Sequence, residues 1–346
     1  MTLNSENWTE ALEINSDGSL IGKEMNGVLL SCGCSMTLGA ELGEFKDYFV
    51  PNDKTTQFRN VDGSYRNEHR FPTLLAKKMG LSSHNIAKGG SSNYRTVRML
   101  RDYFANDENP IPSMTLVQLT DASRFEIHGG DELCYDIQKH MDKSEAPVSM
   151  GAVIAGGIYS PDGDDINPIE EYGQVMSTMG EQWDEVSWQS LFKYQSYPHT
   201  LMDLMRQVLS LVDMFRQAQC RFYIMDMFAL EGQMRRVIGD LETIEKSENL
   251  FIPKDSCQFI TLHSNANIRK KYFTYLKKTN MLNNFRNLYN KVMAVPEFSS
   301  IRYSEFTDKK NKEKFVGVMP HGHPDEKCHS FIADTIYNDM KEKRLW

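Results

Sequence analysis

Short apolar runs alternate with segments of helical spacing along most of this 346-residue chain. Each apolar run is expected to be a strand: residues 27–32, 85–87, 114–119 and 221–227. Segments with apolar residues three or four positions apart are expected to be helices: 71–79, 92–104, 200–217, 229–248, 266–293 and 325–341. Strands that alternate with helices pair in parallel, because the helix serves as the crossover. The sequence therefore predicts an α/β fold with a parallel sheet.

The first run leads into a turn whose residues suit chemistry. Residues 27–39 read Gly-Val-Leu-Leu-Ser-Cys-Gly-Cys-Ser-Met-Thr-Leu-Gly, so the apolar stretch ends in small residues and reaches Ser35. Open α/β sheets bind ligands at the carboxyl ends of their strands, and the free amides of a helix N-terminus can stabilise an anion there. Ser35 is therefore a candidate nucleophile. The alternative is a serine that caps the following helix.

Two later segments form an ordered pattern with this turn. Asn85-Ile-Ala-Lys-Gly-Gly-Ser-Ser-Asn93 is a glycine turn after a short strand, and His321-Gly-His-Pro-Asp-Glu-Lys-Cys-His329 precedes the last helix. The pattern resembles the SGNH (GDSL-like) hydrolase superfamily, and most closely a branch with a Gly-Cys-Ser first block that occurs in phage and marine microbial proteins. The similar blocks are residues 27–43, 71–104, 114–126 and 321–337.

This resemblance implies a three-layer α/β/α, flavodoxin-like fold and a serine hydrolase that cleaves an ester. A carbohydrate O-acetyl ester is one candidate substrate. Ser35 is expected to attack the carbonyl, and His323, which precedes Pro324, is expected to accept its proton. The backbone amides of Ser35 and Gly90 are expected to bind the oxyanion.

The resemblance assigns further residues to the site. Asn93 or Thr120 would add another donor to the oxyanion, and a helix N-cap is the alternative for Asn93. Arg124 and His321 are expected beside the substrate, where Arg124 would bind a carboxylate or phosphate. An ordinary salt bridge is the alternative for Arg124.

Two departures from the family pattern bear on activity. The superfamily has an aspartate two or three residues before its histidine, whereas this chain has Pro320 and His321 there, and Asp325 follows His323 instead. The third block contains no asparagine. A Ser-His dyad, orientation of His323 by His321 or by a carbonyl, and an inactive site all remain open. The second functional hypothesis is therefore a catalytically inactive SGNH-like structural or binding protein, including a viral one.

Other chemistries have weaker support in the sequence. A tetrahedral zinc site is conceivable if the two ends of the domain meet, with ligands from Cys32, Cys34, His321, His323, Cys328 and His329. A flavodoxin-like cofactor binder shares the expected architecture but gives the serine and histidine no role. We expect neither a metal nor a cofactor. No Gly-x-x-x-x-Gly-Lys loop is present, so nucleotide hydrolysis has no support.

Composition limits the partners and the compartment. The net charge of −8 argues against a nucleic-acid surface, and no apolar stretch is long enough to predict a membrane span. Six cysteines and an N-terminus without the features of a signal peptide indicate reduced thiols in a cytoplasmic or virion-associated protein. A small-molecule or carbohydrate ester is the expected partner. The sequence leaves the oligomeric state open.

The expected domain organisation is a polar lead-in followed by one decorated domain. Residues 1–26 are polar and acidic, and residues 27–346 form the SGNH-like domain. Two stretches break the alternation of strand and helix and are expected to be insertions. Residues 44–69 suit a long loop over the site, and residues 126–190 suit a lid or a small subdomain.

Overall fold

The main sheet confirms the α/β prediction. The computed structural model describes residues 27–40, 42, 63–87, 91–120, 122, 125–128, 152–155, 197–247, 266–301 and 323–346. Its five-stranded sheet has the order β2-β1-β3-β6-β7, and every neighbouring pair is parallel. The strands are β1 (Val28–Cys32), β2 (Ser82–Asn85), β3 (Met114–Leu119), β6 (Arg221–Asp226) and β7 (Phe298–Ser300). Counted along the chain, this is the 2-1-3-4-5 order of flavodoxin-like folds.

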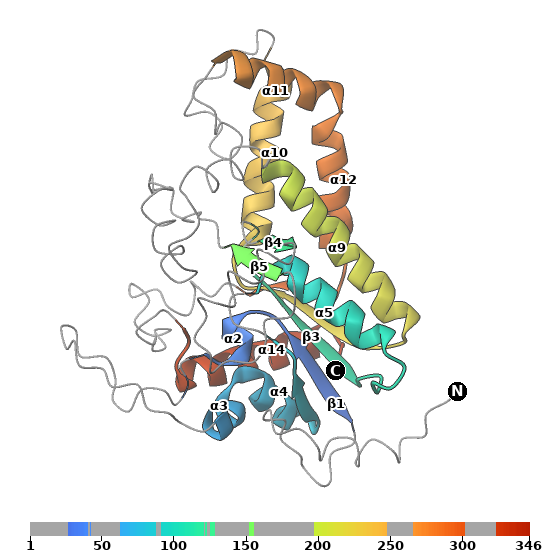
Figure 1. Ribbon diagram of the computed structural model, residues 1–346, viewed down its shortest axis with the longest axis vertical. Helices are drawn as coiled ribbons and strands as arrows, with labels where there is room; N and C mark the ends of the chain where they lie inside the picture. The colour runs from blue at the N-terminus through green and yellow to red at the C-terminus, as the bar shows by residue number, and fades with distance from the viewer. Residues whose placement is uncertain are drawn as a thin grey trace, which may run out of the picture.

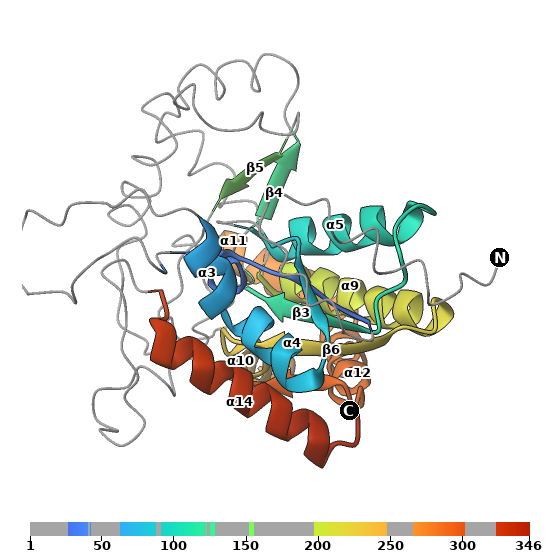
Figure 2. The same ribbon diagram turned by 90° about the horizontal axis from the view of Figure 1, so that it is seen from below.

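Helices cover both faces of this sheet, as Figure 2 shows for α5 and α14. One buried core lies under α5 (Asn93–Ala105), α9 (Tyr197–Gln217), α10 (Leu230–Lys246) and α12 (Met281–Met293). A second core on the other face is closed by α4 (Phe71–Met79) and α14 (Glu326–Glu342). Every residue of β1 is buried, because both faces of the strand pack against helices.

The long helix α9 shows how the apolar spacing produces this packing. Its inward residues recur at helical intervals and are at most 4% exposed: Leu201, Met202, Leu204, Met205, Val208, Leu211, Val212 and Phe215. Burying one such side chain stabilises the fold by about 1.5–3 kcal/mol relative to leaving it exposed. Helices α10, α11 (Ala266–Lys278) and α12 extend together beyond one end of the sheet (Figure 1). No helix in the described ranges is long and apolar enough to cross a membrane.

Three short elements differ from the sequence-based expectation. Strand β2 covers Ser82–Asn85 rather than residues 85–87, because its polar sequence carries no apolar run. Helix α3 (Gly63–His69) occupies the end of the stretch that was expected to be a loop, and β7 was not anticipated. The remainder of residues 44–69 and the lead-in 1–26 lie outside the described residues.

A small second sheet lies in the first part of the stretch 126–190 that is expected to be an insertion. Strands β4 (Phe125–His128) and β5 (Ala152–Ala155) pair antiparallel, separately from the main sheet. Most of the insertion lies outside the described residues.

In the main sheet, the chain crosses from β1 to β2 on one side and then to β3 on the other, so the strand order reverses at β1. This reversal is the position where open α/β sheets bind ligands.

Candidate active site

Ser35 begins a one-turn helix directly after strand β1, which lies next to the central strand β3. This helix, α2, covers Ser35–Leu38, and its N-cap residue is Cys34, whose side chain makes no capping bond. The alternative that Ser35 caps the helix is therefore wrong. Ser35 is half-buried. Within the described part of the chain, neither its hydroxyl nor its N–H has a hydrogen-bond partner, while its carbonyl accepts from Gly39 N at 3.0 Å and Ala40 N at 2.9 Å.

The strand beside β1 holds this turn through a buried glutamine. Gln118 Oε1 accepts from Cys34 N at 3.1 Å, Cys34 Sγ at 3.2 Å and Thr37 Oγ1 at 2.8 Å. A Cβ on Gly33 would lie 2.7 Å from that same oxygen. On the other side, Asn85 Nδ2 donates to the Thr37 carbonyl at 2.7 Å. The turn is therefore fixed from both neighbouring strands.

The end of α2 packs on the junction between α3 and α4. Gly39 has φ +79°, and a Cβ there would lie 2.8 Å from Cβ of Arg70. Arg70 is only 2% exposed, and burial lowers the pKa of its guanidinium to about 10, with a further contribution from Arg66. Arg70 Nε donates to Thr73 Oγ1 at 3.3 Å. A buried cationic side chain thus lies one helical turn from Ser35.

His323, the expected base, lies just before the last helix. It is half-buried and precedes Pro324 and Asp325. Asp325 is the N-cap of α14, with Oδ1 accepting from Cys328 N at 2.8 Å. Burial raises the pKa of this carboxyl, and the hydrogen bond from Cys328 N opposes that shift. The carboxylate nearest to His323 in sequence therefore stabilises the helix start.

A second histidine connects this helix to the Ser35 side of the molecule. His329 is fully buried, and its Nδ1 accepts from Phe71 N at 3.1 Å. Burial, with smaller contributions from the charges of His323 and Arg70, lowers the pKa of His329 to about 3. The imidazole is therefore neutral, with its proton on Nε2, which is buried and meets no hydrogen-bond partner among the described residues.

These contacts form a continuous path between the two candidate residues. The Ser35 carbonyl bonds Gly39, and Gly39 packs against Arg70. Arg70 precedes Phe71, whose amide bonds His329, and His329 lies within electrostatic reach of His323. A contact of 3.7 Å between His69 Nε2 and Glu326 Oε1 also joins α3 to the start of α14. The start of α14 and the end of α2 therefore pack on the same helix junction.

The second and third sequence blocks meet through one side chain. Asn93 Nδ2 donates to the Thr120 carbonyl, and Asn93 Oδ1 accepts from Thr120 N, both at 2.8 Å. Ser92, not Asn93, is the N-cap of α5, with its hydroxyl accepting from Arg95 N at 3.1 Å. The capping alternative for Asn93 is therefore wrong. Thr120 Oγ1 is buried and has no hydrogen-bond partner in the described ranges.

Three of the expected site residues lie at one edge of the sheet. Ser35, Asn93 and Thr120 lie at the carboxyl ends of β1 and β3 or at the helix starts beside them. Gly90, Arg124 and His321 lie outside the described residues. Gln118 was not identified as part of the turn, although a lone glutamine in the strand Met-Thr-Leu-Val-Gln-Leu is a signal that could have revealed it.

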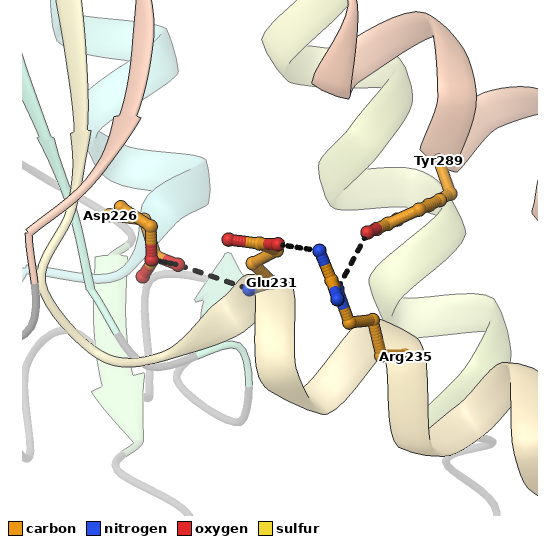
Figure 3. A network of polar contacts seen from close by, with 5 residues as sticks. Asp226, Glu231, Arg235 and Tyr289 are labelled. Carbon is orange, nitrogen blue, oxygen red and sulfur yellow. Dashed lines mark hydrogen bonds and ion pairs between the residues drawn. The ribbon is translucent and has the colours of Figure 1, made fainter.

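A buried aspartate at the end of β6 was also not anticipated. Asp226 accepts from the N–H groups of Phe228, Leu230 and Glu231, each at 3.0 Å, at the start of α10. Burial raises the pKa of its carboxyl, and these three hydrogen bonds oppose that shift. Figure 3 shows Asp226 beside a series of side-chain contacts in which Arg235 bonds both Glu231 and Tyr289. Because its oxygens serve the helix start, we assign Asp226 a structural role.

The two cysteines of the first block do not face a common site. Cys32 belongs to the core under α5 and α9, and burial raises the pKa of its thiol to about 12. Cys34 belongs to the opposite core, with its sulfur on Gln118. Side chains two residues apart in a strand point to the same face. Position 34 lies beyond the end of β1, so this alignment does not apply to Cys32 and Cys34. The described residues hold no group of three potential metal ligands.

Comparison with known proteins gives no sequence relative. No protein-family model matches the chain, and no curated protein matches it. Several solved structures align with it at low similarity. A family 2 carbohydrate esterase from Corynascus thermopiles (Myceliophthora fergusii) is 10% identical over 92% of this chain and 67% of its own, with a TM-score of 0.37.

Two further structures align in a comparable way. An acetyl xylan esterase from Butyrivibrio proteoclasticus is 12% identical over 92% of this chain and 65% of its own, with a TM-score of 0.36. A putative lipolytic protein of the G-D-S-L family from Desulfitobacterium hafniense is 9% identical over 92% and 99%, with a TM-score of 0.30. The chain spans about two thirds of the length of the two carbohydrate esterases. At these TM-scores the alignments assign neither a family nor a substrate.

Proposed function

We propose that this chain is a serine hydrolase of esters, with Ser35 as nucleophile and His323 as base. The observation that carries the proposal is the position of Ser35. It follows strand β1 at the reversal of strand order, and Cys34 occupies the N-cap position in its place. Its hydroxyl and N–H have no partner within the described part of the chain, so both groups are available to a substrate.

The proposed reaction uses these groups in two steps. His323 accepts the proton of the Ser35 hydroxyl while Oγ attacks the ester carbonyl, and the protonated imidazole then gives that proton to the departing alcohol. Water hydrolyses the acyl-enzyme through the same groups. The Ser35 N–H, the Thr120 hydroxyl and the Gly90 amide are the proposed oxyanion donors. The missing hydrogen-bond partner of Thr120 Oγ1 in the described ranges supports this role, because its O–H is not committed to another group.

The proposed substrate class is a small acyl ester, with carbohydrate O-acetyl esters as its natural members. This narrower step follows the resemblance of the sequence blocks to the SGNH superfamily. Arg124 and His321 are the proposed substrate contacts.

The proposal is tested by labelling with a fluorophosphonate probe and by hydrolysis of p-nitrophenyl acetate and acetylated xylan. The intact chain should be labelled once, at Ser35, and should hydrolyse the acetyl esters. Ser35→Ala should abolish labelling and turnover. Ser210→Ala is the matched control, because that half-buried serine of α9 accepts a hydrogen bond from Arg101 of α5 at 2.9 Å, and its loss should leave both unchanged. Labelling that persists in Ser35→Ala would refute the assignment.

A catalytically inactive binding protein is the second candidate, and one observation favours it. Asp325, the carboxylate nearest to His323 in sequence, caps α14. Under this alternative the folded chain takes up no fluorophosphonate and releases no acetate, yet retains acetylated carbohydrate in an affinity experiment. Stoichiometric labelling at Ser35 would exclude it.

A further inference from the structure

We propose that Gln118 is the positioning residue of the Ser35 site. The inference rests on the proposed function and adds a residue that acts through the β1–α2 turn without touching the substrate. One oxygen of Gln118 accepts from Cys34 N, Cys34 Sγ and Thr37 Oγ1, at 2.8–3.2 Å, so its partners lie on both sides of Ser35.

The orientation of the Gln118 amide is determined by its surroundings. Its Nε2 donates to the Leu119 carbonyl at 2.8 Å, and its Oε1 faces two N–H or O–H donors and a thiol. A flipped amide would place an NH₂ group against the N–H of Cys34 and a carbonyl against that of Leu119. Gln118 is fully buried, so water cannot substitute for these bonds.

Helix α2 depends on contacts of this kind. It has four residues, and an isolated helix of that length is unstable because nucleation is unfavourable. Its position must therefore be set by neighbouring strands. Gln118 holds the start of the turn, and Asn85 holds the Thr37 carbonyl at 2.7 Å. Gly33 allows the close approach, since a Cβ there would lie 2.9 Å from Gln118 Cβ.

The hydrogen bonds also decide which amide is left for an oxyanion. Gln118 takes the N–H of Cys34, whereas the N–H of Ser35 has no partner within the described part of the chain. Gln118 lies two residues before Thr120 on the same strand end. It therefore ties the turn that carries Ser35 and its amide to the end of β3, where Thr120 follows. An acyl-transfer site requires its nucleophile and oxyanion donors to be held in fixed positions.

The first variant removes the acceptor while keeping the volume. Gln118→Leu should lower kcat and the rate of fluorophosphonate labelling by about 10²-fold with little change in KM, because a misplaced nucleophile weakens only the reacting geometry. Thr115→Val is the matched control, since Thr115 is a buried polar residue of the same strand, five positions before Thr120, and its hydroxyl contacts Cys220 Sγ at 3.2 Å. Equal rates of fluorophosphonate labelling in Gln118→Leu and Thr115→Val would overturn the inference.

The second variant tests positioning by a pH signature. In Gln118→Glu, the protonated carboxyl reproduces both bonds, since its carbonyl oxygen accepts and its hydroxyl donates to Leu119 O. The ionised form repels that carbonyl. Over a pH range in which both proteins are folded, the labelling rate of the variant divided by that of the intact chain should rise as pH falls. A ratio that does not change with pH contradicts the positioning role.

Hydrogen exchange separates this inference from the proposed function. Gln118→Leu should accelerate amide exchange in a peptide covering residues 33–38 relative to Thr115→Val, whether or not Ser35 is reactive. An intact chain that is not labelled, combined with faster exchange in Gln118→Leu, refutes the hydrolase and leaves Gln118 as the residue that holds the turn. Unchanged exchange overturns the inference even if Ser35 is labelled.

Discussion

Asn93 and Thr120 hold the start of α5 against the end of β3 through two hydrogen bonds of 2.8 Å each. In the first, the side-chain N–H of Asn93 donates to the Thr120 carbonyl. In the second, the Thr120 N–H donates to the side-chain oxygen of Asn93. Asn93 is 2% exposed and Thr120 is fully buried. Because β3 ends at Leu119, the backbone groups of Thr120 have no partner in a neighbouring strand. The side chain of Asn93 supplies the two hydrogen bonds in place of that strand.

Asn93→Ala should therefore destabilise the fold strongly. It leaves a buried N–H and a buried C=O unpaired, and each such group costs about 1–3 kcal/mol. We expect a loss of about 2–5 kcal/mol in the free energy of unfolding, measured by urea denaturation. The control is Asn106→Ala at the other end of α5, where the side chain accepts from Glu108 N in an exposed turn. Equal losses in the two variants would contradict this account.

The elements that could be predicted from sequence are those with a continuous apolar signal. Strands β1 and β3 are buried on both faces and read as apolar runs, and α4 and α9 carry apolar residues at helical spacing. Strand β2 was misplaced because Ser-Ser-His-Asn lies at the sheet edge and has no such run. Strand β7 has three residues, too few to establish a period.

The candidate site was predictable only where local chemistry marks it. Glycine and small residues after an apolar run mark the turn at Ser35, and His-Pro marks the approach to α14. Gln118 and His329 carry no such mark, because their partners lie 81–84 and 258 residues away in the chain. Contacts at that separation follow from the sheet order and from helix packing, neither of which the sequence displays.

The buried His329 makes the stability of the fold depend on pH. Its folded pKa is about 3, below the ordinary value of 6.5, because burial disfavours the charged imidazole. Below pH 6.5 the unfolded chain binds a proton that the folded chain does not, so stability present above that pH is lost as pH falls toward 3. We expect a slope from this residue approaching about 1.4 kcal/mol per pH unit between pH 6 and 4.

The measurement is the free energy of unfolding across that pH range for the intact chain and for His329→Gln. The variant removes the titrating group. It should therefore reduce the slope of the unfolding free energy against pH by up to about 1.4 kcal/mol per pH unit, which corresponds to one proton. His69→Gln is the control, because that imidazole is 36% exposed and should leave the slope closer to that of the intact chain. A slope that persists in His329→Gln would assign the effect to other groups.

A polar cluster on the α14 face of the sheet should contribute to stability. Tyr223 Oη and Ser299 Oγ each donate to Asp339 Oδ2 at 2.6 Å, and Lys343 Nζ lies 3.1 Å from the same oxygen. Partial burial acts to raise the pKa of Asp339, but the hydrogen bonds from Ser299 and Tyr223, together with Lys343, lower it overall. The ionised carboxylate therefore stabilises the fold above the unfolded pKa, and this contribution is lost as pH falls through the folded pKa.

Tyr223→Phe removes one donor from this cluster without changing the ring. Hydrogen bonds to charged groups contribute about 1.5–3 kcal/mol, so a loss of that size is expected at pH 7. In Asp339→Asn the added effect of Tyr223→Phe should fall below about 1 kcal/mol, because the carboxylate acceptor is gone. A double-mutant cycle at pH 7 measures the coupling, and additive losses would show that the two side chains act independently.

Two glycines at helix ends allow the packing around α2 to be separated from backbone strain. Gly39 follows α2 with φ +79°, and Gly80 follows α4 with φ +67°. A Cβ at position 80 would meet nothing within 4 Å, whereas a Cβ at position 39 would lie 2.8 Å from Cβ of Arg70. Gly80→Ala should therefore lower the free energy of unfolding only by the cost of holding an alanine in the left-handed conformation, about 1–2 kcal/mol. Gly39→Ala should cost a further ~1–3 kcal/mol, because the α2 turn and the Arg70 backbone must move apart.

The same displacement should reach Ser35, since Gly39 N bonds the Ser35 carbonyl at 3.0 Å. Gly39→Ala should therefore slow labelling of Ser35 by the fluorophosphonate probe, while Gly80→Ala, although strained, should leave the rate unchanged. Both readouts, the free energy of unfolding in urea and the labelling rate, are taken on the same preparations. If the two variants lose the same free energy of unfolding and Ser35 is labelled at the same rate in both, the contact between Gly39 and Arg70 does not hold the turn in place.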